Sequence, residues 1–421
     1  MALALGLGFA ATVHAQSAGG GGSAGSGGAA GGAVIQPLVV DYGVTARAEY
    51  VDNFGFNGRA TWINSIGPSA TLRMDSEVLK IAGSASLLGV HYSNDAAGRP
   101  NTTQPRFNLL STYLRERSTI GLNVQYYRDR NLAGTQPLLT GGFQAVGGDR
   151  SVLSVGPTYS YALTERLSAN ANYGYSTITF AQNSPSQANS VGHTLGGGLQ
   201  YRLNELDTVG VSVSESRFST DPNVTESDSR SYQASWNRRW SEATTTALFV
   251  GIADTEVRGR STQTVCLVPV QFCLAGLFPF QTITTGSVNS NRTPTYGLTW
   301  STQFTQQTTA GAQLSRAIQP GAGGSLTERE FWSADVVHRF SERLSATVDY
   351  SRTRTAFAGT SLALSSAIQV LSLGMNYELG ENWAFGAGAR VSRTSVAVAE
   401  PISRAVFVTL SRTWPNNRLW P

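Results

Sequence analysis

The feature that most constrains this chain is a tight-turn pattern that recurs between stretches of alternating side chains. The pattern is an aromatic residue or Leu, then a small polar residue or Gly, then Glu or Gln, and most copies are about forty residues apart. Its copies are Leu163-Thr164-Glu165, Leu203-Asn204-Glu205, Trp240-Ser241-Glu242, Phe304-Thr305-Gln306, Phe340-Ser341-Glu342 and Leu379-Gly380-Glu381. Two membrane-length strands, one short turn and one longer loop fill such a repeat.

Between these turns, apolar side chains alternate with small or polar ones. Leu371, Leu373, Met375 and Tyr377 illustrate a period of two residues, which is typical of strands. Short turns also alternate with longer connections rich in Pro, Asn, Gly and Ser. A soluble sandwich or propeller would also show alternating side chains, but its connections need not alternate between short and long. We therefore predict an all-β fold, a transmembrane antiparallel up-and-down β-barrel of about eighteen strands.

Composition supports this fold class. Charged residues make up 14% of the chain, Gly occurs 45 times, and the formal charge is 31 − 27 = +4. No basic run is interleaved with aromatic residues as a nucleic-acid surface requires, so we predict no nucleic-acid partner. No internal segment holds the eighteen or so consecutive apolar residues of a membrane helix, so if the protein lies in a membrane, it crosses as strands.

The two ends of the chain predict export to an outer membrane. Residues 1–15 are an apolar stretch ending in Val13-His14-Ala15, which predicts a signal peptide, although no Lys or Arg precedes the apolar core. Residues 16–37 predict a Gly/Ser-rich periplasmic tether, 38–414 the barrel and 415–421 a C-terminal tail. The expected location is the outer membrane of a Gram-negative bacterium. The expected partners are outer-membrane lipid, lipopolysaccharide and the outer-membrane assembly machinery.

Aromatic residues are expected at the two membrane interfaces. Beside the short turns lie Trp240, Phe304, Phe340 and Trp383. Near the longer loops lie Tyr92, Tyr126, Tyr127, Phe180 and Phe218. This joint placement predicts two girdles on the outer wall.

Few residues point to chemistry. Cys266 and Cys273 lie in the longest predicted loop, residues 258–289, and their spacing predicts a disulfide in an oxidising compartment. The scattered His91, His193 and His338 show no metal-ligand spacing. We therefore expect no metal and no cofactor. A serine beside one of these histidines would make a barrel-embedded hydrolase, an alternative that stays open, although we predict no catalytic residues and no enzyme.

Two further patterns concern the barrel wall. Gly196-Gly197-Gly198 lies inside an alternating strand with no helix after it, which favours close packing or curvature over a phosphate loop. Four charged residues are candidates for the lumen: Asp349, Glu378, Arg390 and Arg412. They would either set a field for a passing solute or form a network that blocks flow.

The segment Ala48-Glu49-Tyr50-Val51-Asp52-Asn53, then Ile66-Gly67-Pro68-Ser69-Ala70-Thr71-Leu72, then the repeated hairpins resemble a known family. These are the outer-membrane β-barrels associated with PEP-CTERM/exosortase exopolysaccharide systems. The resemblance implies a pore or export component of the cell envelope, with polysaccharide or small solutes as partners. A general diffusion porin and a non-conducting surface anchor or adhesin are the alternatives.

Overall fold

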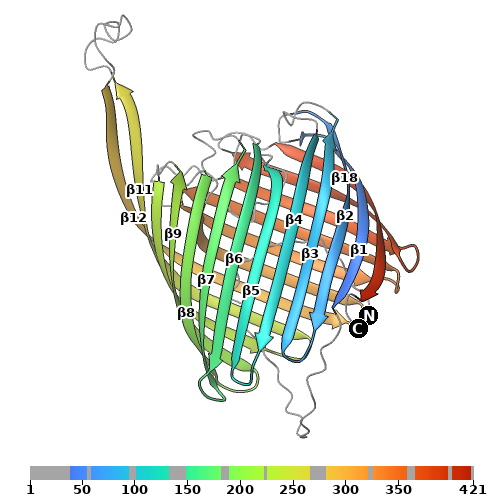
Figure 1. Ribbon diagram of the computed structural model, residues 1–421, viewed down its shortest axis with the longest axis horizontal. Coiled ribbons are helices and arrows are strands. Elements are labelled where there is room, and N and C mark those ends of the chain that lie inside the picture. Colours follow the sequence, from blue (N-terminus) through green and yellow to red (C-terminus); the bar gives the residue numbers. More distant parts are fainter. Residues whose placement is uncertain are drawn as a thin grey trace, which may run out of the picture.

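The computed structural model describes residues 38–54, 58–93, 101–131, 148–181, 189–221, 225–265, 281–320, 326–357, 366–396 and 401–418. They form eighteen antiparallel strands in one sheet, which closes because β1 pairs with β18 (Figure 1). The strands are β1 (Val39–Val51), β2 (Thr61–Asp75), β3 (Leu79–Tyr92), β4 (Asn101–Leu114), β5 (Ser118–Asn131), β6 (Gly148–Ala162), β7 (Leu167–Phe180), β8 (Asn189–Arg202), β9 (Asp207–Asp221), β10 (Thr225–Arg239), β11 (Thr244–Val265), β12 (Gln281–Thr305), β13 (Thr308–Pro320), β14 (Leu326–Arg339), β15 (Leu344–Phe357), β16 (Ser366–Glu378), β17 (Trp383–Val396) and β18 (Ile402–Arg418). The predicted transmembrane antiparallel β-barrel is confirmed.

The seam between β1 and β18 joins the two ends of the barrel. Val39 lies opposite Arg418 and Val51 opposite Ala405. Strand β18 therefore continues past Trp414, where the sequence had predicted the start of a tail. The predicted signal peptide (1–15) and tether (16–37) lie outside the described residues.

The outer wall is an apolar belt. On β16, Leu371, Leu373, Met375 and Tyr377 are 42% to 50% exposed, and the residues between them face inward. Other strands continue the belt, as Val211 and Val213 on β9 and Val406 and Val408 on β18 do at 47% to 59% exposure. An outward apolar face is what a strand that crosses the hydrocarbon core of a membrane requires. None of the described segments is a helix of the length and apolarity that a membrane span requires.

Side-chain hydrogen bonds explain the recurring turn pattern. In four of the six copies, the second residue accepts a hydrogen bond from a backbone N–H three residues later, as Thr164 does from Leu167 at 3.0 Å and Asn204 from Asp207 at 2.8 Å. Thr305 and Ser341 do the same at 3.0 and 3.1 Å. Such bonds replace the strand ladder where the chain reverses, so a short oxygen-bearing side chain recurs at this position.

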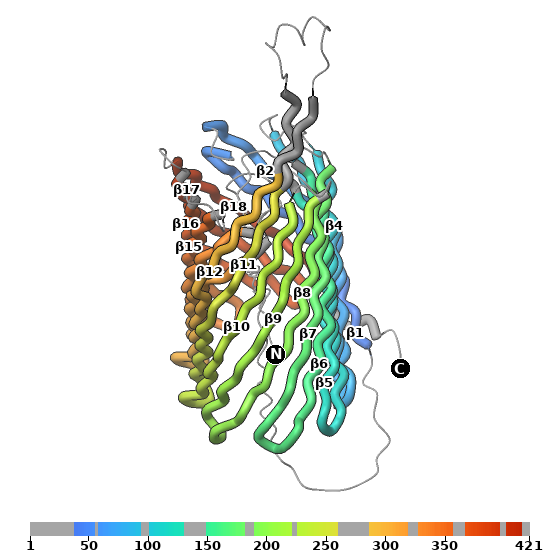
Figure 2. The backbone as a smooth tube through the Cα atoms, turned by 90° about the vertical axis from the view of Figure 1, so that its left-hand side faces the viewer, coloured from blue at the N-terminus to red at the C-terminus, as the bar shows by residue number. Residues whose placement is uncertain are grey.

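Two strands are much longer than the rest. Strands β11 and β12 remain paired from Thr244 opposite Thr302 up to Val265 opposite Gln281. Figures 1 and 2 show this long hairpin rising beyond the barrel rim at the end opposite the short turns. The sequence had predicted a loop over residues 258–289, so much of that loop is paired strand. Cys266, Cys273 and their predicted disulfide lie outside the described residues.

Buried apolar side chains gather on the inner face near the long loops. One cluster consists of Val51, Phe54, Val90, Tyr92 and Ala405, and the other of Tyr127, Val152, Ile178 and Phe180. The predicted outer girdle at this end is therefore wrong for four aromatic residues, each 9% exposed or less: Tyr92, Tyr127, Phe180 and Phe218. Beside the short turns, the exposed fractions are 41% to 64% for Trp240, Phe304, Phe340 and Trp383.

Candidate functional site: the inner wall of the barrel

Seven of the eighteen strands, β7 to β13, have an inner face that is polar and, beyond the short-turn rim, uncharged. Strand register defines rows of inward positions around this sector. One row is Asn172, Gly196, Ser214, Ser231, Ala253 and Thr293, and the next is Asn170, Gly198, Ser212, Gln233, Gly251 and Thr295. Among the described inward positions of these strands, charge occurs at Arg202 and Arg239, both at the short-turn rim. Thr293 and Thr295 are buried, at 2% and 3% exposure, whereas the Ser, Asn and Gln side chains of the two rows are partly or fully exposed. The accessible polar groups of the two rows are therefore hydroxyls and amides.

Hydroxyl groups on neighbouring strands bond to one another across this uncharged sector. The oxygen pairs are Thr194 with Ser216 at 3.0 Å, Ser214 with Ser231 at 2.9 Å, and Ser229 with Thr255 at 3.2 Å. Ser229 and Thr255 are buried, whereas the hydroxyls of the other two pairs are partly exposed. Because a hydroxyl can both donate and accept, these two pairs can exchange their internal bonds for bonds to a solute. The sector therefore offers many weak polar contacts in place of one strong binding site.

The glycines at Gly196 and Gly198 make room for two amide side chains. A Cβ on Gly196 would lie 2.6 Å from the Asn172 Oδ1, and one on Gly198 would lie 3.3 Å from the Asn170 Oδ1 and 2.6 Å from the Val211 carbonyl oxygen. Close approach of neighbouring groups requires Gly at both positions, as the sequence pattern had predicted. The asparagines consequently lie along the wall.

The opposite sector carries charge, and part of that charge is paired. Glu49 accepts from Arg47 Nη2 at 2.9 Å and from Arg390 Nη2 at 2.5 Å, and it is only 7% exposed. The Arg47 guanidinium also lies 4.1 Å from the centre of the Phe407 ring. These residues belong to β1, β17 and β18, so they meet only because the barrel closes. Arg390 was predicted to face the lumen, whereas Arg47 and Glu49 were missed.

The two predicted acidic lumen residues lie on the same inner face as Arg390. Asp349 on β15 is directly opposite Asp335 on β14, and both are exposed. Glu378 lies at the short-turn end of β16, opposite Ala384. The sequence did not predict the Asp335–Asp349 pair, because only the register between β14 and β15 shows that the two carboxylates face each other.

Arg412 does not face the lumen. Its guanidinium carbon lies 5.2 Å from the centre of the Trp383 ring and 4.7 Å from that of Trp414, and both rings are exposed on the outer wall. Arg412 shares its face with Val408 and the other apolar residues of the last strand. The prediction of Arg412 as a lumen charge is thus corrected to an outer interface position.

A second inward ion pair was missed by sequence reasoning. Arg150 Nε donates to Asp129 Oδ1 at 2.8 Å and its Nη2 to Oδ2 at 3.1 Å, and Arg150 is 2% exposed. Tyr127 lies beside this pair, with its ring centre 5.9 Å from the guanidinium carbon. The alternation of Tyr127 and Asp129 with the outward residues Tyr126 and Arg128 was the available signal. The pair fastens β5 to β6 near the long-loop rim.

The three histidines all face outward. His91 Nδ1 lies 2.7 Å from Asn101 Oδ1, His193 Nδ1 lies 2.8 Å from the Tyr173 hydroxyl, and His338 Nδ1 lies 2.9 Å from Thr308 Oγ1. None of these contacts is with a serine, so the barrel-hydrolase alternative gains no support from them. Among the described residues, no group of three or more His, Cys, Asp or Glu side chains has the arrangement of a metal site.

No family model and no curated protein matches the sequence. The barrel is similar to Pseudomonas aeruginosa OccK5 (OpdH), with a TM-score of 0.44 and 12% identity over 92% of this chain and 100% of that chain. It is also similar to Pseudomonas aeruginosa OprD, with a TM-score of 0.42 and 10% identity over 91% and 98%. For the outer membrane protein OpdK of the same organism the values are 0.40 and 9%, over 89% and 99%.

Proposed function

We propose that this chain is an outer-membrane channel whose inner wall guides a neutral, hydroxyl-rich solute of the saccharide class. The observation that carries the proposal is the inner face of β7 to β13, where charge at the described positions is confined to Arg202 and Arg239 at the short-turn rim. Barrels of sixteen to eighteen strands leave an aqueous channel where smaller barrels fill with side chains. Passage requires binding that is weak and repeated, and rows of hydroxyl and amide groups supply such contacts.

The chemistry of the wall matches that of a sugar. Saccharide hydroxyls donate and accept hydrogen bonds, as do Ser and Thr, while Asn and Gln side chains offer both kinds of group. A wall of fixed charges would instead hold ionised solutes. On the opposite side, the charge of Glu49 is already taken up by Arg47 and Arg390. The uncharged sector is therefore the surface along which we expect a neutral solute to travel.

The family resemblance extends this proposal to a biological setting. It suggests that the solute is a segment of a cell-surface polysaccharide and that the channel belongs to an exosortase-linked export system. This extension rests on the Ala48-to-Asn53 and Ile66-to-Leu72 segments and is independent of the inner wall. A general diffusion porin would show no preference for neutral sugars, so solute selectivity separates the two hypotheses.

The test is conductance and solute uptake by the refolded chain. We expect stable single-channel steps in a planar bilayer, and faster swelling of liposomes in a neutral disaccharide than in its uronic-acid counterpart. Ser214→Val/Ser231→Val should slow disaccharide entry by roughly fivefold, since about 1 kcal/mol of hydrogen bonding is lost. Ser214→Thr/Ser231→Thr keeps both hydroxyls and serves as the control. Equal entry of both sugars would refute the proposed selectivity.

The long hairpin favours a second candidate, a surface anchor or adhesin. It extends two paired strands beyond the rim, where a partner can reach them (Figure 2). Deleting residues 259–287 and joining Arg258 to Val288 through Asn-Gly leaves strands of barrel height. For a channel, we expect unchanged conductance and unchanged surface adhesion. Loss of adhesion to polysaccharide-coated cells from a silent barrel would favour the anchor.

A further inference from the structure

The inward aromatic residues of the barrel differ in what covers them. Those near the long-loop rim are buried, whereas Phe249, Phe331 and Phe407 lie further from that rim and are partly exposed. The Arg47 guanidinium lies 4.1 Å from the centre of the Phe407 ring, and that of Arg329 lies 5.2 Å from the centre of the Phe331 ring. Among the described residues, no cation–ring contact involves Phe249. The Phe249 ring is therefore accessible to a solute without displacing an arginine.

The Phe249 ring lies over a glycine. Phe249 on β11 is directly opposite Gly297 on β12. A Cβ on Gly297 would lie 2.1 Å from Phe249 Cε1 and 2.6 Å from its Cζ, so the ring occupies the space that a side chain would fill. Aromatic side chains cover glycines on neighbouring strands in this way. The ring consequently lies along the wall, and since Phe249 is partly exposed, the side away from Gly297 faces the lumen.

Amide side chains lie on both sides of this ring. Gly251 is the next inward position on β11, and a Cβ there would lie 2.8 Å from Gln233 Cγ, so Gln233 lies over it. On β13, Ser315 is directly opposite Gly297, which makes Gln313 a diagonal neighbour of that glycine. Diagonal neighbours are about 7 to 8 Å apart, within reach of long side chains. Both glutamines are partly exposed, so their amides can bond to a solute that lies on the ring.

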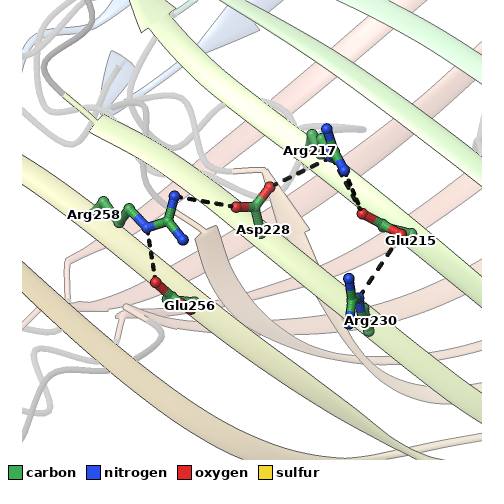
Figure 3. A network of polar contacts seen from close by, with 6 residues as sticks. All are labelled: Glu215, Arg217, Asp228, Arg230, Glu256 and Arg258. Carbon is green, nitrogen blue, oxygen red and sulfur yellow. Dashed lines mark hydrogen bonds and ion pairs between the residues drawn. The ribbon is translucent and has the colours of Figure 1, made fainter.

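Most of the charge on β9 to β11 lies on the opposite, outer face of these strands. Figure 3 shows a network of alternating charges there, which consists of Glu215, Arg217, Asp228, Arg230, Glu256 and Arg258. Its ion pairs are 2.8 to 4.0 Å long between guanidinium nitrogen and carboxylate oxygen. On β11, Glu256 and Arg258 share the outward face of exposed Val250, whereas Phe249 lies on the inward face. The ring and its two amides thus form an uncharged site.

A pyranose ring matches such a site. When its hydroxyls are equatorial, they project around the rim, and axial C–H groups form apolar faces above and below. The face of an aromatic ring is negative and attracts these C–H groups, while amides donate and accept hydrogen bonds at the rim. An acyclic polyol has the hydroxyls without the faces. One aromatic ring with a few placed polar groups is also the usual composition of a small-molecule site.

We propose that Phe249 is a stacking site for a pyranose ring, and that Gln233 and Gln313 bind the hydroxyls at the rim of that ring. The site takes saccharides built from rings with equatorial hydroxyls. The inference rests on the proposed function and makes it more specific. Rows of hydroxyl and amide groups alone would serve any neutral polyol, whereas an accessible aromatic face favours cyclic sugars.

The test is binding of cellotriose, a trisaccharide of β-linked glucose, to the refolded full chain in detergent, titrated by saturation-transfer NMR. Phe249→Leu keeps an apolar side chain without an aromatic face and should raise the Kd about fivefold, which corresponds to about 1 kcal/mol. Phe249→Tyr keeps the face and should bind as the unaltered chain does. Phe407→Leu, at the ring that Arg47 covers, is the matched control and should also leave the Kd unchanged. Sorbitol, an acyclic polyol, should show no dependence on residue 249.

Four results would overturn the inference. One is an unchanged Kd for Phe249→Leu, and another is an equal loss with Phe249→Leu and Phe249→Tyr, which would mean that the ring face is not the contact. The third is an equal effect on sorbitol, which would mean a general change in the wall. The fourth is no binding of cellotriose by the unaltered chain.

Failure of the proposed function is a separate result. Equal entry of the neutral disaccharide and its uronic-acid counterpart refutes that function whatever Phe249→Leu does. Retained preference for the neutral sugar, with an unchanged Kd in Phe249→Leu, refutes the stacking site alone. A heat-dependent shift in gel mobility verifies that each variant is folded.

Discussion

At the scale of single residues, charged side chains on the inner wall occur both as pairs of opposite charge and as a pair of like charge. Glu49 lies between Arg47 and Arg390, whereas Asp335 and Asp349 face each other across two strands. Opposite charges in this geometry stabilise a strand pair and like charges destabilise it. The Glu49 carboxylate also joins strands that are not neighbours, because β18 lies between β17 and β1. Its contribution therefore concerns the closure of the barrel.

Glu49→Gln is expected to lower the free energy of unfolding by about 2 kcal/mol, because it leaves two partly buried guanidiniums without their carboxylate. The midpoint of urea unfolding of the refolded barrel measures this loss. Glu49→Gln/Arg390→Gln removes one of the stranded charges and should recover part of it. A single variant as stable as the unaltered chain would mean that solvent screens the pair fully.

At the scale of elements, the short turns hold the register of each hairpin. Asn204 accepts from the backbone N–H groups of Leu206 and Asp207, both at 2.8 Å, and donates to the Asp207 carboxylate at 3.0 Å. A one-residue slip would turn the apolar face of a strand into the lumen. The turn side chain opposes such a slip by fixing where the new strand begins.

Asn204→Ala is expected to lower the free energy of unfolding by about 1 kcal/mol and to slow refolding, because the bonds that close the β8–β9 turn are lost. Urea unfolding and the time course of the gel-mobility shift measure the two effects. Glu165→Gln, at an exposed position of the preceding turn, is the matched control. Equal refolding rates for Asn204→Ala and this control would contradict the assigned role.

At the scale of the whole molecule, the strand count and the closed antiparallel barrel followed from local patterns. Alternation and repeated turns are properties of ten to forty neighbouring residues, and every pairing except the seam is a hairpin. The same alternation could have prevented two wrong predictions. Arg412 lies an even number of residues from Val408 and so shares its face, whereas Tyr127 lies on the opposite face from its neighbour Tyr126. The Glu49–Arg390 contact required the register across β18, which no local pattern supplies.

The seam has a consequence for the order of folding. Its partners, Val39 and Arg418, are separated by nearly the whole described chain, whereas every other pair joins strands that are consecutive in the sequence. Loop closure over this separation costs roughly 2–3 kcal/mol more than closing a hairpin. Contacts of high sequence separation form late, so the hairpins should assemble first into an open, curved sheet. Until its ends meet, that sheet presents two unpaired edges, β1 and β18, each a template for another strand.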